Sequence, residues 1–322
     1  MTFTGPGGLN ETTVLDASGE ACVTTTVLAT GTVTATYNGD GCAAVSSGST
    51  DVTVEEASTT TVATATPDPS VCGQSVEVCA TVTVDPPGSG TPTGTVTFTG
   101  PGGLNETTVL DASGTACVST TVLATGTVTA TYNGDGCAAV SSGSTDVTVE
   151  EASTTTVATA TPNPSVCGES VTVCATVSTD APGSGTPTGT VTFTGPGGLN
   201  QTVPLDAFGT ACVTTTVLAT GTVTANYNGE GPCFAGSSDT VDVMVNAADT
   251  TTVVTASPDP SVCGQSVDVC ATVTTNAPGS GTPTGTVTFT GPGGLNETTV
   301  LDASGTACVS TTVLATGTVT AT

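Results

Sequence analysis

Thirteen cysteines are the residues of this chain that could do chemistry. Thiols can pair as disulfides, bind a metal ion or stay free and buried, and the redox compartment and spacing decide between these uses. Zinc sites usually hold cysteine pairs two to four residues apart, whereas the nearest spacing here is Cys72 to Cys79. We therefore favour disulfides formed in an oxidising compartment. The cysteines recur in four positional classes: Cys72, Cys167 and Cys263; Cys79, Cys174 and Cys270; Cys22, Cys117, Cys212 and Cys308; Cys42, Cys137 and Cys233.

Lys, Arg and His are absent from the sequence. Without them there is no Ser-His or Cys-His nucleophile, no Schiff base, no phosphate clamp and no histidine metal ligand. A net charge of −27 also argues against binding nucleic acid, because a polyanion requires cations. A pair of carboxylates could serve a glycosidase, but nothing in the pattern pairs them. We expect no enzyme, no catalytic residue and no nucleic-acid partner.

Acidic turns are the remaining candidate for a metal ion. The phrase NGDG at 38–41 and 133–136 offers oxygen ligands, and Glu150, Glu151 and Asp180 could add to them as a calcium site. The next copy of the phrase reads NGEG, and the acidic linker there becomes NAAD. A required site would not vary in this way within one chain. We expect ordinary turns and no cofactor, with calcium as the alternative.

Two surface patterns have both a functional and an ordinary explanation. Runs such as TVTATY are similar to ice-binding faces, but alternating Thr is also typical of any exposed strand. Asn-x-Thr sequons could accept glycans, although Thr is so abundant that chance produces them. They begin at Asn10, Asn105, Asn200 and Asn296.

The chain is a repeat of about 95 residues, a period that defines its architecture. The phrase TFTGPGG returns at each period, as does YNG. Met1 stands where other copies have Val96, Val191 and Val287, which predicts an internal valine codon read as a start, and a longer parent array. The predicted domains are a C-terminal part of a repeat at 1–57, complete repeats at 58–152 and 153–248, and an N-terminal part at 249–322.

Within a repeat, apolar and polar residues alternate over short runs bounded by Gly, Pro, Asn and Asp. Seven short strands in one repeat indicate an antiparallel two-sheet sandwich. Val76, Val78, Ala80 and Val82 share one face of the second strand and are predicted core. The strands are expected at 59–66, 75–84, 94–99, 107–110, 115–123, 126–132 and 144–150.

The repeat resembles the bacterial Ig-like domains of group 3. The resemblance lies in TTTVATATPDPSVCGQSVEVCATVTV, then GTPTGTVTFTG, then the strand that ends in ATYNGD. Such domains occur in tandem in large secreted and surface proteins, and the resemblance implies an immunoglobulin-like sandwich, an extracellular spacer or adhesive role, and no catalytic residue. The family is usually poor in Cys, whereas each complete repeat here has four.

The Ig-like fold implies a pairing for the cysteines. Its second and fifth strands are neighbours in one sheet, and Cys79 and Cys117 should both point outward from them. We expect Cys79 to pair with Cys117, with a stabilisation of about 4 kcal/mol from closing the loop. The equivalent pairs are Cys174 with Cys212 and Cys270 with Cys308.

The loop cysteines need a different partner. Cys72 and Cys137 fall at opposite ends of a repeat, on the order of 30 Å apart and far beyond the reach of a disulfide. If repeats stack head to tail, Cys72 of one faces the late loop of the next, which predicts a disulfide with Cys233 between two domains.

The expected function is a structural stalk that holds another module away from a bacterial cell. Its partners would be neighbouring Ig-like repeats of the same chain, and no run of the sequence is apolar enough to span a membrane. The alternative is an adhesin-type module that contacts a surface glycan or partner protein, with or without calcium. Three Tyr and no Trp offer no aromatic platform for a sugar, which favours the spacer.

Overall fold

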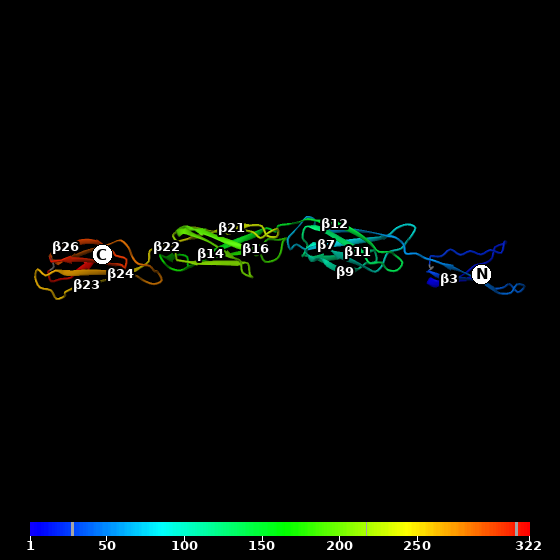
Figure 1. The fold of residues 1–322 in the computed structure, drawn as a ribbon, viewed down its shortest axis with the longest axis horizontal. Coiled ribbons are helices and arrows are strands. Elements are labelled where there is room, and N and C mark those ends of the chain that lie inside the picture. The colour runs from blue at the N-terminus through cyan, green and yellow to red at the C-terminus, as the bar shows by residue number, and fades with distance from the viewer. Residues whose placement is uncertain (27–28, 217, 313–314) are drawn as a thin grey trace. The chain divides into compact units, whose positions relative to one another are not determined.

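A computed structural model of the chain describes residues 1–26, 29–216, 218–312 and 315–322 (Figure 1). Nearly all of its regular structure is β-strand, which confirms the predicted all-β class. The chain divides into two compact units. The first holds Met1–Ser70 and Ser75–Val149, and the second holds Val71–Gln74 and Glu150–Thr322. Among the described residues, no helix is long and apolar enough to cross a membrane.

The complete repeat of the first unit is a sandwich of two antiparallel sheets. Alternation of Val and Ala with Thr gives each strand one apolar face, and the two apolar faces pack together. The three-stranded sheet has the order β10 (Thr115–Thr120), β7 (Val76–Val84), β5 (Thr59–Thr66). The four-stranded sheet has the order β12 (Ser141–Val147), β11 (Gly126–Tyr132), β8 (Thr95–Thr99), β9 (Asn105–Val109).

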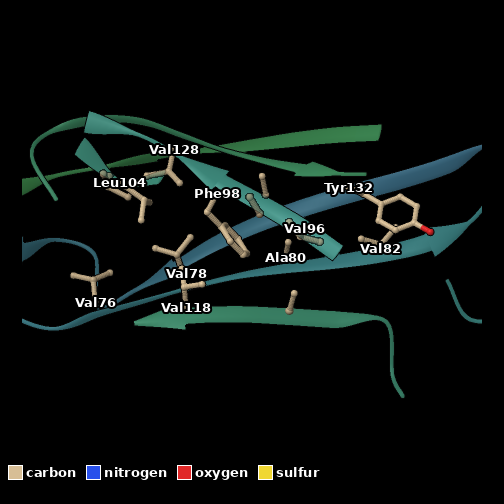
Figure 2. Close-up of a cluster of buried hydrophobic side chains, with 14 of the residues drawn as sticks. Val76, Val78, Ala80, Val82, Val96, Phe98, Leu104, Val118, Val128 and Tyr132 are labelled. Atoms are coloured by element: carbon tan, nitrogen blue, oxygen red, sulfur yellow. The ribbon is translucent and has the colours of Figure 1, made fainter. Parts of the chain in front are cut away.

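The core of this repeat lies between the two sheets. Figure 2 shows Phe98 and Val96 of one sheet facing Val78 and Ala80 of the other. All four side chains are buried, as are Val76 and Val82, so the predicted core face of the second strand is the observed one. Valine and alanine make up most of the cluster, with Phe98 and Tyr132 as its large side chains.

The second unit contains a second complete sandwich. Its sheets are β14 (Thr154–Thr161), β16 (Val171–Thr179), β19 (Thr210–Thr215) and β18 (Leu199–Pro204), β17 (Thr190–Gly195), β20 (Gly221–Tyr227), β21 (Ser237–Val243). A short parallel pair adds β15 (Ser165–Val166) to β22 (Val245–Asn246). Ala152 is buried in this second core although it precedes the predicted boundary at 153.

The segments before and after the two sandwiches form fewer strands. The front one is a single sheet of β2 (Asn10–Thr12), β1 (Thr2–Thr4), β3 (Gly31–Tyr37) and β4 (Ser46–Val52). The rear one has two three-stranded sheets: β23 (Thr250–Ser257), β24 (Val267–Thr275), β27 (Thr306–Thr311), and β26 (Leu295–Val300), β25 (Thr286–Gly291), β28 (Thr320–Ala321). The bounds of the four predicted domains stay a prediction.

Several strand bounds differ from the predicted ones. The strand expected at 115–123 ends at Thr120, and the strand expected at 144–150 begins at Ser141 and breaks before β13 (Val149–Glu150). A short strand that the pattern did not predict, β6 (Ser70–Val71), pairs with β13. Two residues are too few for alternation to reveal a strand. The turn Pro101–Gly103 is a single 3-10 turn, in which Gly102 has a φ of 78°.

Candidate functional site

Three cross-strand disulfides occupy equivalent positions in three repeats. Cys79 lies opposite Cys117 in the register of β7 and β10, and the pairs Cys174–Cys212 and Cys270–Cys308 repeat this arrangement. In each disulfide the two Cα atoms are 4.1 Å apart. Because Cys79 alternates with the buried Val78 and Ala80, its sulfur lies on the outer face of the sheet, away from the core.

A fourth disulfide joins Cys72 to Cys233, with Cα atoms 5.2 Å apart and a sequence separation of 161 residues. Both cysteines belong to the second compact unit, because Val71–Gln74 groups with it. The backbone N–H of Cys72 also donates to the carbonyl oxygen of Glu150 at 2.9 Å. The disulfide therefore joins segments from two consecutive repeats of the sequence.

The turn beside Cys72 accepts two hydrogen bonds from a serine of the next repeat. The N–H of Ser184 donates to the carbonyl oxygen of Cys72 at 3.4 Å, and its hydroxyl donates to that of Gly73. The same contacts recur one repeat later, where Ser280 donates to the carbonyl oxygens of Cys167, at 3.3 Å, and of Gly168. We call these two contacts the serine seats. Neither alternation nor cysteine spacing predicts these contacts, although the phrase PGSG that carries each serine recurs in every repeat that contains this loop.

Five cysteines are free and exposed, and all of them are among the described residues. Cys167 is one of them, so the second serine seat is formed without a disulfide. Cys137, the counterpart of Cys233 in the preceding repeat, is another. The remaining three are Cys22, Cys42 and Cys263.

One group of three potential metal ligands comes together in the described part of the chain: Glu77, Cys79 and Cys117. The two sulfurs of this group are bonded to each other, and a disulfide sulfur is not the thiolate that zinc requires. The outer face of β7 therefore carries a covalent cross-link and not a set of thiolate ligands.

Asp135 of the NGDG phrase closes its own turn. One carboxylate oxygen accepts from the N–H groups of Cys137 and Ala138, at 2.9 and 2.7 Å. The other accepts from the N–H and hydroxyl of Thr93, at 2.9 and 2.8 Å. These hydrogen bonds, that of the Thr93 N–H first, hold the pKa of Asp135 well below its usual range. Its oxygens are thus engaged by donors of the protein.

Glu150, Glu151 and Asp180, the acidic residues that could add to a calcium site, are exposed or half-buried. Glu150 and Glu151 are exposed, and Asp180 accepts a hydrogen bond from the hydroxyl of Thr155 at 2.8 Å.

Two open grooves, of about 460 and 430 Å³, lie in the described part of the chain, the first over β1, β3 and β4 and the second beside Asn163 and Met244. Asp242 is the single carboxylate lining either groove, so neither holds the pair that a glycosidase needs.

The sequons are exposed, whereas the threonines of the run TVTATY at 127–132 are exposed or half-buried. Asn10, Asn105, Asn200 and Asn296 are exposed at the start of equivalent strands. Threonine hydroxyls on these strands pair across the sheet, as Thr97 does with Thr107 at 2.9 Å. Paired hydroxyls satisfy one another, which is the ordinary role of Thr on a strand.

A sequence profile of the bacterial Ig-like domain, group 3, matches residues 63–150 and 158–246, more than half of the chain. The chain belongs to this family, with at least two copies in tandem. This confirms the resemblance carried by the GTPTGTVTF and ATYNGD phrases. A search among curated proteins found no match.

Among solved structures, the chain is similar to a tetra-tandem repeat from the extending region of a large adhesion protein. The two share 21% identity over 96% of this chain and 81% of that one, with a TM-score of 0.43. It is similar to invasin, a bacterial integrin-binding protein, at 18% identity over 72% and 49% of the two chains, with a TM-score of 0.42. A 1.5-MDa bacterial ice-binding adhesin has 20% identity over 80% and 88%, with a TM-score of 0.27.

Proposed function

We propose that this chain is an extracellular stalk segment, a non-catalytic spacer of tandem Ig-like domains in a secreted or cell-surface bacterial protein. The observation that carries the proposal is the cross-strand disulfide that recurs in equivalent register in three repeats. Structural disulfides persist in oxidising compartments, and a cross-link copied in three repeats serves the stability of each of these three domains. The partners of each domain are its neighbours in the same chain.

The charge of the surface supports a spacer. With a net charge of −27 and no Lys, Arg or His, the carboxylates can only repel one another. Salt screens exposed charges beyond about 8 Å at physiological ionic strength, so the repulsion is weak, but it opposes collapse and self-association throughout the array.

Labelling of intact cells tests the proposal. Antibodies raised against residues 1–322 are applied to intact and to lysed cells that produce the natural protein. A stalk requires labelling of intact cells, or recovery of the protein from the medium in disulfide-bonded form. Labelling that appears only after lysis, with all thirteen cysteines alkylated, would place the protein in a reducing compartment and reject the proposal.

The second candidate is an adhesin-type binding module. The observation that favours it is the Pro-Gly-Gly turn at Pro101–Gly103, which has no buried residue and recurs in all four repeats with the same conformation. Identical exposed turns could bind a repeated ligand polyvalently. Binding of the purified chain to arrays of glycans and surface proteins, with and without calcium, separates this candidate from a spacer that binds none of them.

A further inference from the structure

Three of the four disulfides are nested, and the fourth, Cys270–Cys308, lies outside them. Cys72 and Cys233 are 161 residues apart in the sequence, whereas each cross-strand pair spans 38. The pairs Cys79–Cys117 and Cys174–Cys212 both lie within the long loop that Cys72–Cys233 closes. Two short covalent loops are thus enclosed in one long covalent loop.

This nesting decides which parts of the backbone can carry tension. A pull on the two ends of the chain follows the shortest covalent route, which runs along the backbone to Cys72, crosses the disulfide to Cys233 and continues from there. Outside the disulfides, the strands are held together by packing and by hydrogen bonds. A single hydrogen bond contributes only about 1 kcal/mol to stability. The backbone from 73 to 232 can lengthen only if a covalent bond breaks.

We propose that the Cys72–Cys233 disulfide is a covalent clamp that transmits tension and so removes most of the two complete repeats from it. The biological role of the clamp rests on the proposed stalk function. Its resistance to extension is a property of the purified chain and does not depend on that function. A spacer so clamped cannot lengthen within residues 73–232 under a pull that would unfold an unclamped sandwich.

The strands on either side of the clamp fit this role. Of the complete repeats, β5 and β6 precede Cys72, and β21 and β22 follow Cys233, so only these short segments lie in the path of the load. Every strand from β7 to β20 is sheltered. The sheltered strands include β7, β8 and β11, which supply Val78, Phe98 and Val128 to the first core, all three fully buried.

The serine seats show that the disulfide is not needed to position the turn. Ser280 makes its hydrogen bonds to Cys167 and Gly168 although Cys167 is free. Ser184 makes the equivalent bonds to Cys72 and Gly73, where the disulfide is present. Because the same contact forms in both cases, the contribution specific to Cys72–Cys233 is a covalent route for force.

Single-molecule force spectroscopy of the oxidised 322-residue chain, held by its two ends, tests the clamp. The wild type should lengthen only by its segments outside 73–232. In Cys233→Ser the long loop opens while both short loops stay closed, which frees about 85 of the 161 residues, or roughly 300 Å at ~3.5 Å per residue. The double variant Cys72→Ser with Cys233→Ser should give the same gain and excludes mispairing of Cys72.

The matched control is Cys137→Ser, which alters the equivalent late-loop cysteine where it is free. Its traces should superimpose on those of the wild type. Circular dichroism and peptide mapping establish that each variant is folded and keeps Cys79–Cys117 and Cys174–Cys212. A wild type that already shows the additional ~300 Å, or a Cys233→Ser that gains nothing, overturns the clamp. Cell labelling tests the stalk independently, so either proposal can fail alone.

Discussion

Ser184 rests directly on Gly73, its hydroxyl donating to the Gly73 carbonyl oxygen. Gly73 has a φ of 74°, and a Cβ added there would collide with the carbonyl oxygen of Ser184. Gly264 occupies the equivalent position of the rear repeat with a φ of 79°, and a Cβ there would meet nothing within 4 Å. Glycine is therefore required at position 73 both by the positive φ and by the close approach of Ser184. At position 264 only the positive φ requires it.

Gly73→Ala should displace the turn from its serine seat and separate Cys72 from Cys233. We expect the two thiols to become partly alkylatable in native protein, as measured by mass spectrometry without reductant. Gly264→Ala carries only the left-handed strain, about 1 kcal/mol, and should leave the Cys72–Cys233 disulfide complete. Equal alkylation of Cys72 in the two variants would contradict the role assigned to Ser184.

Loss of a cross-strand disulfide should destabilise its repeat strongly. Replacing Cys79 and Cys117 together by Ser removes a cross-link over a separation of 38 residues, which is worth about 4 kcal/mol in the chain-entropy account. Urea denaturation followed by circular dichroism measures the loss. Cys22→Ser, at a free and exposed cysteine, is the control and should not move any transition. Coincident midpoints for the double variant and the wild type would refute the prediction.

The two buried tyrosines should respond oppositely to loss of their hydroxyl. Burial first, and then the nearby Asp135 carboxylate, raises the pKa of Tyr132 to about 12, and no group of the described residues lies within normal hydrogen-bond geometry of its hydroxyl, Asp135 included. Tyr227 donates to the carbonyl oxygen of Thr188 at 2.7 Å. Tyr132→Phe should thus be neutral or stabilising, whereas Tyr227→Phe should lower the free energy of unfolding by about 1 kcal/mol. Thermal and urea denaturation compare them, and an equal loss in both variants contradicts the assignment.

Acid should weaken the first complete repeat through Asp135. Hydrogen bonds hold its pKa below the unfolded value of about 3.9, so its contribution is present above that pH and is lost as pH falls toward the folded pKa. Wild type and Asp135→Asn are compared by urea denaturation at neutral pH and at several values below 4. The wild type should be the more stable at neutral pH, and the difference should shrink with acidification. A difference independent of pH would indicate that the charge of Asp135 is not involved.

Much of this protein was predictable because its signals are local. Alternation with a period of two placed Val76 and Val78 in the core and Cys79 on the outer face, since successive side chains of a strand point to opposite sides. The period of about 95 residues and the GTPTGTVTF phrase were sufficient for the fold class and the family. None of these inferences requires knowing which strands are neighbours in space.

Tertiary structure decided the contacts between distant segments. Ser184 and Gly73 are 111 residues apart, and nothing in either phrase indicates that one will rest on the other. The same holds for Tyr132 and Tyr227, whose sequence contexts both read Tyr-Asn-Gly but whose hydroxyls differ in having a partner. Hydrogen bonding depends on distances of a few tenths of an ångström that only the packed chain sets, whereas alternation and repetition are already complete in the order of the residues.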